Sequence, residues 1–486
     1  MNIPRSMSTQ HPDNVSQPFF VDNSIIAGDD EIKEAFYAFS HLKITEQLWD
    51  CEGKEVDNFV IEKLLTKYPD FFSKKTLGKD VFITLRTPNP RIEKDKGKLL
   101  LETLESIPRN FDISREFYKN GKAPIFEVTV PMVSSAQEIL MVKNYYDQHV
   151  IGKAHTKLSG MKIKDWVGDF MPKEINVIPL IEDKNSMLKA DKIVREYVQK
   201  AKIKNYQRVW LARSDPALNY GNISAVLINR IAFQKLYNLQ KELGIDIYPI
   251  IGCGGVPFRG NFTPNTAQRI VNVYPSVQTF TMQSAFKYDY PEDKVRKAVR
   301  LIEKTKRTHP NYVDEKKSLE IIEKVSKNYQ SQIKELAPIV NKMSTHIPQR
   351  RKRKLHVGLF GYSRDGSGVK LPRAIKFCAS LYSLGLPPEI LGMNDLNKED
   401  WRFLRENSGL IEDMKDAIQY FNKDCLTLLS DQLKEQIIKS LKPFEIEINE
   451  AHKKITSIII EDFKNNNLIS LSENIERAAS IRRFLG

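Results

Sequence analysis

The residues of this sequence that are best suited to chemistry stand just after short apolar runs. Two of them are carboxylates: Glu182 follows the run at 175–181, and Asp215 follows the run at 209–212. Two carboxylates that project into one cleft suit Mg²⁺ or Mn²⁺, because these ions take a few carboxylates and complete their shell with water and substrate oxygens. The alternative is that each carboxylate only caps the helix that follows it. The spacing leaves both interpretations open.

Glycine-rich loops and arginines recur at similar positions. The segment GCGGVPFRGN at 252–261 includes Gly254, Gly255 and Arg259. Glycines let backbone N–H groups turn toward an anion, and arginine forms a two-pronged contact with phosphate or carboxylate. No Gly-Lys-Ser/Thr follows, so this is not a Walker loop. A flexible turn is the alternative interpretation.

Three further arginines extend this pattern. Arg86 ends an apolar run, Arg364 lies in the loop GYSRDGSG, and Arg373 begins the segment RAIKFCASLYSL. An isolated arginine is usually a surface ion pair, so the prediction depends on convergence. Together with Arg259, these side chains could surround one small polyanion.

His11 lies in the segment STQHPDN near the start of the sequence. A lone histidine is more often structural than catalytic. If this segment folds over the mouth of the site, however, His11 could transfer protons near neutral pH.

The apolar runs themselves predict the fold. Each is four to eight residues long and rich in β-branched or aromatic residues, as expected for strands buried on both faces. Helical patterns separate them, which indicates βαβ crossovers and a parallel sheet. We therefore expect an α/β fold, a (β/α)₈ TIM barrel whose active site lies at the carboxyl ends of the strands. A doubly wound open sheet is the alternative. The eight runs are 42–49, 81–86, 125–130, 175–181, 209–212, 247–251, 278–282 and 355–360.

The flanks of the predicted barrel differ from its repeats. Residues 1–40 are expected to form an N-terminal arm that contributes to the active site without being a barrel repeat. Residues 41–392 form the barrel, with a helical insertion near 292–345. After Gly392 the strand signal vanishes, so 393–486 should be an all-helical region packed on the barrel.

Composition limits the classes of protein to consider. The chain has 486 residues, 28% of them charged, and a formal net charge of +14. This excess suits a nucleic acid or a small polyanionic substrate. The run QRRKRK at 349–354 is either a solvated loop before a strand or a nucleic-acid or targeting patch. The four cysteines form no CxxC pair, which argues against zinc or a disulfide framework and favours a reducing compartment. No signal peptide or membrane span is evident, so we expect a soluble, cytoplasmic protein.

Several motifs make the chain recognisable. STQHPDN, FRGN after a glycine-rich loop, TFTMQSAFKYDYP and HVGLFGYSRDGSGVKLPRAI together resemble phosphoenolpyruvate carboxylase of the short, archaeal type, over essentially the whole chain. VIPLIED and ARSDPALNYG also look like the two metal-carboxylate strands of the larger bacterial and plant form. The resemblance implies the following assignments: metal ligands Glu182 and Asp215; catalytic residues His11, Arg259, Arg364 and Arg373; and substrate-binding residues Arg86, Gly254, Gly255 and Gln283.

The sequence departs from the larger form at three of its motif positions. Cys253 stands where that form has an arginine, Leu218 where it has a lysine, and Asn261 where it has a glycine. Any role of the missing arginine and lysine therefore cannot be transferred to this chain.

The resemblance also implies a reaction. Phosphoenolpyruvate and bicarbonate would give oxaloacetate and phosphate, through carboxyphosphate and a metal-bound enolate, with Mg²⁺ or Mn²⁺ as cofactor. The implied assembly is a homotetramer with neither a nucleic acid nor a membrane as partner. Two rivals remain: another Mg-dependent barrel lyase of the phosphoenolpyruvate/pyruvate family, and a non-enzymatic nucleic-acid binder that uses the basic charge.

Overall fold

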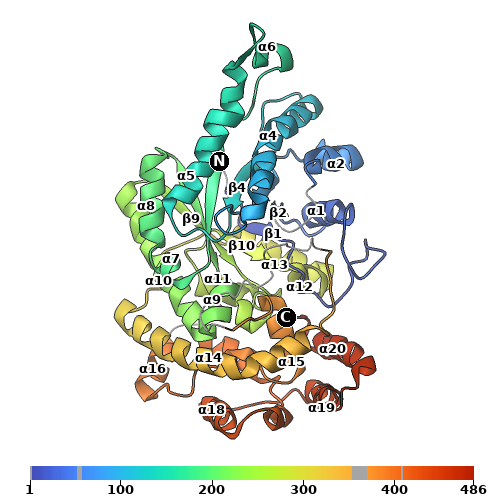
Figure 1. The fold of residues 1–486 in the computed structure, drawn as a ribbon, viewed down its shortest axis with the longest axis vertical. Coiled ribbons are helices and arrows are strands. Elements are labelled where there is room, and N and C mark those ends of the chain that lie inside the picture. The colour runs from blue at the N-terminus through green and yellow to red at the C-terminus, as the bar shows by residue number, and fades with distance from the viewer. Residues whose placement is uncertain (1–2, 52–56, 353–368, 407–408) are drawn as a thin grey trace.

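Eight parallel strands form a closed barrel at the centre of the protein, with helices around it (Figure 1). The computed structural model describes residues 3–51, 57–352, 369–406 and 409–486. The predicted TIM barrel is confirmed, and the open doubly wound sheet is wrong. In order around the barrel the strands are β1 (Ser6–Ser8), β10 (Thr279–Met282), β9 (Asp246–Gly252), β8 (Tyr206–Ala212), β7 (Asn176–Ile181), β4 (Ile125–Val130), β3 (Phe82–Arg86) and β2 (Glu46–Asp50).

The strand that closes the barrel comes from the N-terminal arm. β1 pairs in parallel with β10 on one side, with Ser8 opposite Met282, and with β2 on the other. The expectation that residues 1–40 are not a barrel repeat was therefore wrong, because they supply this strand and the helix Asp30–Ser40 that follows it. The sequence Ser6-Met7-Ser8 is too short, and lacks the β-branched residues, to be recognised as a strand. The predicted strand at 355–360 lies outside the described residues.

The barrel interior holds an apolar layer and a charged layer. Met7, Leu48 and Trp210 belong to a buried cluster that is separate from the larger core between the strands and the helices. In the charged layer, both Nη atoms of Arg208 donate to Glu46, and Nη1 also donates to Glu127, at 2.7–2.8 Å. All three of these charged side chains are fully buried, as ion pairs must be when they lie inside a packed barrel.

Most helices cover the outside of the barrel. α10 has buried residues on all sides, because the strands lie on one side and α14 and other helices on the other. The helices are α1 (Asp30–Ser40), α2 (Val60–Lys67), α3 (Pro69–Phe72), α4 (Gly97–Tyr118), α5 (Ala136–Tyr145), α6 (Ile163–Val167), α7 (Lys184–Leu188), α8 (Ala190–Lys200), α9 (Ser214–Tyr220), α10 (Asn222–Leu243), α11 (Ala267–Val273), α12 (Ser284–Tyr288), α13 (Glu292–Lys304), α14 (Glu315–Ser344), α15 (Ala374–Ser383), α16 (Lys398–Glu406), α17 (Leu410–Ile418), α18 (Asp431–Leu441), α19 (Glu450–Lys464) and α20 (Leu468–Arg482).

Two parts of the chain extend beyond the barrel repeats. A projecting arm, residues 141–168, carries the short hairpin β5 (Lys157–Leu158) and β6 (Met161–Lys162) and ends in α6 at the top of Figure 1. At the opposite end of the molecule, α14 and the helices α15 to α20 gather. α17 contacts the short helix η4 (Pro257–Arg259), so this helical region reaches the loop that follows β9.

All four cysteines are buried and free. Within the described ranges, no helix is both long and apolar enough to cross a bilayer.

Candidate active site

A cavity of about 780 Å³ opens at the carboxyl ends of the strands. It contains most of the residues that the sequence indicated. His11, Arg86, Glu182, Asp215, Arg259, Gln283 and Arg373 all line it. Arg364 lies outside the described residues. One rim therefore brings together side chains from segments up to 362 positions apart, as expected for a barrel enzyme.

The two carboxylates enter this cavity from neighbouring strands. β7 and β8 pair with Ile181 opposite Leu211, so Glu182 and Asp215 follow adjacent strand ends. Neither carboxylate is the N-cap residue of the helix that follows it: Asp183 caps α7 by accepting from the backbone N–H of Ser186, and Arg213 is the N-cap residue of α9. The helix-capping alternative therefore does not hold in the form of an N-cap.

The donor set of the pair fits a hard divalent cation. Carboxylate oxygens suit Mg²⁺ or Mn²⁺, and Mg²⁺ commonly takes only one or two protein carboxylates together with water and substrate oxygens. Among the residues that the structure describes, no group of three or more His, Cys, Asp or Glu side chains could hold a metal ion. Glu182 and Asp215 would therefore leave most coordination positions to water and substrate.

Arg259 is held firmly at the edge of the cavity. Its side chain is 2% exposed, and its Nε donates to the hydroxyl of Ser214 at 3.1 Å. Nη1 donates to the carbonyl of Gly486 at 2.8 Å, and Nη2 donates to Gln283. Ser214 directly precedes Asp215, so the arginine loop is tied to the strand end that carries a proposed metal ligand.

The glycine loop differs from the expectation of N–H groups that face an anion. The N–H of Gly254 donates to the carbonyl of Arg259 at 2.8 Å, and the N–H of Gly255 donates to Asp13 at 3.2 Å. At Gly254 a Cβ atom would stand 2.9 Å from Cζ of Arg259 and 3.1 Å from Oε1 of Gln283. Gly254 therefore lets the guanidinium group and the amide approach the backbone closely. The flexible-turn alternative also fails, because the loop is buried and internally hydrogen-bonded.

Arg86 and Arg373 reach the cavity from different elements. In the β2–β3 register Asp50 lies opposite Arg86, and Nη1 of Arg86 is 3.7 Å from Oδ2 of Asp50. Arg373 is the N-cap residue of α15. Lys370 and Lys376 line the cavity on either side of it.

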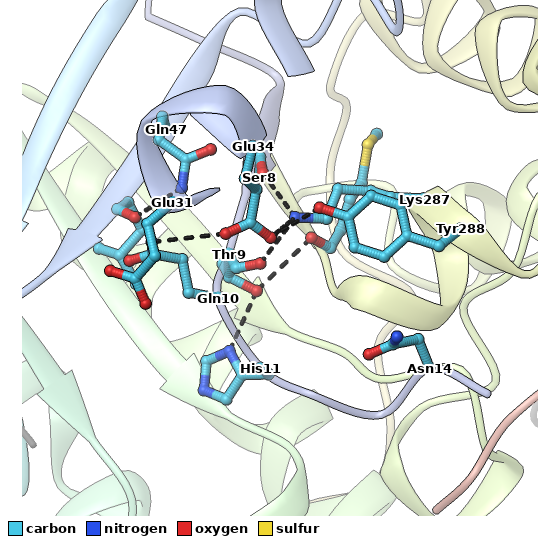
Figure 2. Close-up of polar contacts among 12 residues, drawn as sticks. Ser8, Thr9, Gln10, His11, Asn14, Glu31, Glu34, Gln47, Lys287 and Tyr288 are labelled. Carbon is cyan, nitrogen blue, oxygen red and sulfur yellow. Dashed lines mark hydrogen bonds and ion pairs between the residues drawn. The ribbon is translucent and has the colours of Figure 1, made fainter. Parts of the chain in front are cut away.

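His11 lies on the segment that leaves β1, and that segment is fixed on several sides (Figure 2). Nδ1 of His11 is 3.0 Å from the hydroxyl of Thr9. The carbonyl of His11 accepts from the N–H groups of Asp13 and Ser284, at 3.1 and 3.2 Å. The arm therefore does reach the barrel mouth and holds the histidine at the cavity.

A buried cluster of charges lies behind this segment. Glu34 on α1 accepts from Lys287, Arg351 and the hydroxyl of Tyr288, at 2.7–2.9 Å. Burial alone would raise the pKa of Glu34, but the charges of Arg351 and Lys287 outweigh it and hold that pKa well below its usual range. Burial lowers the pKa of Lys287, although Glu34 opposes this shift.

Sequence reasoning missed several residues of the cavity. Arg213 directly follows the apolar run at 209–212 and lines the cavity, but no role was predicted for it. The cavity also includes Trp210, Gln349, Arg350 and Arg351. Arg350 and Arg351 belong to the basic run, yet both are buried: Arg350 pairs with Glu476, and Arg351 with Glu31 and Glu34. The interpretation of this part of the run as a solvated loop was wrong, and the pairing removes it as an exposed nucleic-acid patch.

The closed parallel barrel, with two carboxylates and several arginines lining one cavity at the carboxyl ends of its strands, defines the class: a TIM-barrel enzyme. A family model described as phosphoenolpyruvate carboxylase matches residues 3–486. The chain belongs to the phosphoenolpyruvate carboxylase family, whose members are carboxy-lyases.

Its relatives match over full length. Phosphoenolpyruvate carboxylase of Methanospirillum hungatei is 48% identical over 489 residues, with 100% of both chains covered. That of Methanothermobacter thermautotrophicus is 48% identical over 488 residues, again with complete coverage. A malate synthase structure from Haloferax volcanii with magnesium and glyoxylate is 8% identical and has a TM-score of 0.40, covering 85% of this chain and 98% of that one.

Proposed function

We propose that this protein carboxylates phosphoenolpyruvate with bicarbonate to give oxaloacetate and inorganic phosphate. The observation that carries the proposal is the convergence of His11, Glu182, Asp215 and three arginines on one cavity. Family membership indicates which substrates to expect, and the charged side chains of the cavity suit these two anions.

Binding is the first task of these residues. Both substrates are anions and repel one another, so cationic side chains must offset their charge. Arg86, Arg259 and Arg373 supply that charge from three different elements: β3, η4 and the start of α15. We propose that Glu182 and Asp215 hold Mg²⁺ or Mn²⁺, which when bound supplies a Lewis acid and a template for the substrates.

The chemistry then requires one proton transfer that a side chain must perform. Attack of a bicarbonate oxygen on phosphorus breaks the bond from phosphorus to the enol oxygen, and yields carboxyphosphate and the enolate of pyruvate. His11 takes the carboxyl proton of carboxyphosphate, whose remaining C–O bond to phosphate breaks to release CO₂ and phosphate. The enolate carbon attacks CO₂ and forms oxaloacetate, and the proton leaves on phosphate.

Arg259 and Gln283 have a second task in this scheme. An enolate that meets water is protonated to pyruvate, so the site must exclude water until CO₂ is captured. The link from Arg259 to Gln283 and to the backbone oxygen of Gly486 supports this role, because it holds two cavity-lining side chains in buried, fixed positions.

One assay tests the proposal. Purified protein with phosphoenolpyruvate, Mg²⁺ and bicarbonate should release phosphate, and coupled reduction of oxaloacetate should consume an equal amount of NADH. Omission of bicarbonate should abolish both signals. Phosphate release without oxaloacetate in the wild-type enzyme, or no reaction with either Mg²⁺ or Mn²⁺, would contradict the proposed function.

The proposal also covers the oligomeric state and the cellular location. We propose a homotetramer, from the family resemblance. We also propose a reducing, cytoplasmic location, which the four buried free thiols support.

A further inference from the structure

Thr9 lies between the buried charge cluster and His11. It is fully buried at the end of β1 and does not line the cavity. Its carbonyl accepts from Nζ of Lys287 at 3.0 Å, and Lys287 also donates to the hydroxyl of Ser8 and to Glu34, both at 2.9 Å. All three protons of the ammonium group are therefore engaged, and the one donated to the carbonyl of Thr9 fixes the backbone there (Figure 2).

The hydroxyl of Thr9 has two neighbours. It is 3.0 Å from Nδ1 of His11 and 3.5 Å from the carbonyl oxygen of Met282. A hydroxyl has one proton to donate and lone pairs with which to accept. The carbonyl oxygen can only accept, so a hydroxyl proton directed at Met282 leaves the lone pairs of the oxygen facing His11. In this arrangement Nδ1 carries the proton of the imidazole and donates it to the hydroxyl of Thr9.

The position of the ring leads to the same assignment. Nδ1 faces Thr9 and Nε2 lies on the far side of the ring from it (Figure 2), so we assign the contact with substrate in the cavity that His11 lines to Nε2. In neutral imidazole only one nitrogen has an available lone pair, and a base at Nε2 requires the proton on Nδ1.

We propose that Thr9 is a positioning residue that fixes His11 in the Nδ1-protonated tautomer, so that Nε2 is the base, and that Lys287 holds Thr9 in place for this task. The inference rests on the proposed function of His11. A threonine hydroxyl thereby does for His11 what a carboxylate or a backbone carbonyl does for many catalytic histidines.

Three variants test the catalytic consequence. Thr9→Val keeps the shape but removes the hydroxyl, so oxaloacetate formation at saturating substrate should fall by up to roughly 100-fold, as for a misoriented catalytic group. Bicarbonate-dependent phosphate release and the KM for phosphoenolpyruvate should change much less. Thr9→Ser retains the hydroxyl and should restore most of the oxaloacetate.

Thr129→Val is the matched control. Thr129 is a fully buried strand residue whose hydroxyl donates to the carbonyl of Ile178 at 3.1 Å, and it does not line the cavity. The same change is made there, without a histidine nearby. If Thr9→Val matches Thr129→Val, or if Thr9→Ser is as impaired as Thr9→Val, the proposal is overturned.

A spectroscopic measurement decides the tautomer without turnover. The histidine ¹⁵N resonances of the whole protein at about pH 8.5, where an ordinary histidine is neutral, distinguish protonated from unprotonated ring nitrogens. The His11→Asn variant identifies the resonances of His11. The wild type should show a protonated Nδ1, and Thr9→Val a mixture of tautomers. A protonated Nε2 in the wild type overturns this inference even if the carboxylation assay succeeds, whereas failure of that assay in the wild type overturns the proposed function.

Discussion

His11 is the residue whose loss should separate the two chemical steps. Attack of bicarbonate on phosphorus needs charge neutralisation but no strong base, whereas breakdown of carboxyphosphate needs a proton acceptor. His11→Asn should therefore lower oxaloacetate formation by about 10²–10⁴-fold, the usual cost of losing a general base. It should still release phosphate with bicarbonate and leave pyruvate behind.

Simultaneous assays of phosphate, pyruvate and oxaloacetate check this prediction. His149→Asn is the control, because His149 is exposed on the projecting arm and should behave as wild type. Equal falls in phosphate and oxaloacetate would assign His11 to binding or to the first step.

Loss of a proposed metal ligand should affect turnover and Mn²⁺ binding, whereas loss of the neighbouring Asp183 should not. Asp215→Ala removes a proposed metal ligand and should lower kcat by roughly 10³-fold, since metal stabilisation of developing charge is worth several kcal/mol. Calorimetry with Mn²⁺ alone should also show weakened binding.

Asp183→Ala is the matched control for that change. Asp183 directly follows Glu182 but caps α7, so its loss should cost about 1 kcal/mol of unfolding free energy and leave Mn²⁺ binding intact. An Asp215→Ala enzyme with normal Mn²⁺ affinity would remove the proposed site.

At the scale of elements, the contact of α1 with α12 depends on a balanced set of charges. Glu31 and Glu34 face Arg351 and Lys287 in a fully buried environment. Lys287→Met leaves one uncompensated negative charge and should lower the unfolding free energy by about 3–5 kcal/mol. Adding Glu34→Gln restores neutrality, so the double variant should be more stable than Lys287→Met alone.

Urea unfolding of the wild type, both single variants and the double variant measures this coupling. Additive losses would mean that the two side chains stabilise the protein independently.

A titratable side chain, that of Asp289, also joins the N-terminal arm (residues 1–40) to the segment after α12. Asp289 accepts from the N–H groups of Val15 and Ser16 at 2.8 and 2.7 Å. Burial raises its pKa to about 7, against the backbone hydrogen bonds, which lower it. Between about pH 4 and 7 the folded state thus holds a proton that the unfolded state has lost, and the stability contributed by this group falls as pH rises.

Asp289→Asn removes that titration. The unfolding free energy of the variant relative to wild type should rise with pH across this window, by at most about 1.4 kcal/mol per pH unit. Urea unfolding at several pH values measures the difference. Parallel curves for the two proteins would contradict the raised pKa.

Most of the barrel strands could be predicted from the sequence, because strands of a buried parallel sheet consist of continuous apolar runs. β7 and β8, with the carboxylates after them, are examples. β1 could not be predicted, since its stability comes from pairing with β2 and β10 rather than from its own residues. The burial of Arg350 and Arg351 was equally invisible, because their carboxylate partners lie on distant helices. The strand-end rule still located the cavity, since it depends only on topology.

At the scale of the whole molecule, we predict that the projecting arm takes part in the interface of the proposed tetramer. Five apolar side chains of this arm are more than half exposed, and apolar residues concentrated on one exposed element are candidates for a protein–protein contact: Met141, Leu158, Met161, Trp166 and Val167. We expect the wild type to sediment as a tetramer of the 56.1 kDa chain at micromolar concentration. Trp166→Lys should shift this equilibrium toward smaller species.

Ile469→Lys is the control for that variant, because Ile469 is 95% exposed on α20 at the far end of the molecule. A wild-type protein that sediments as a monomer would contradict the tetramer. Equal effects of the two lysine variants would remove the arm from the interface.

The strand that closes the barrel, β1, is synthesised long before its partner β10, so the barrel can close only late in synthesis. Thr9, at the end of β1, contacts Met282, a partner made 273 positions later. At usual translation speeds the ribosome needs roughly 14 to 55 seconds to reach that partner. Until then the nascent sheet has unpaired edges that are prone to aggregation and that chaperones can bind. Because His11 follows β1 directly, catalytic competence should be among the last properties that a newly made chain acquires, and regain of carboxylation should lag behind regain of helical signal during refolding.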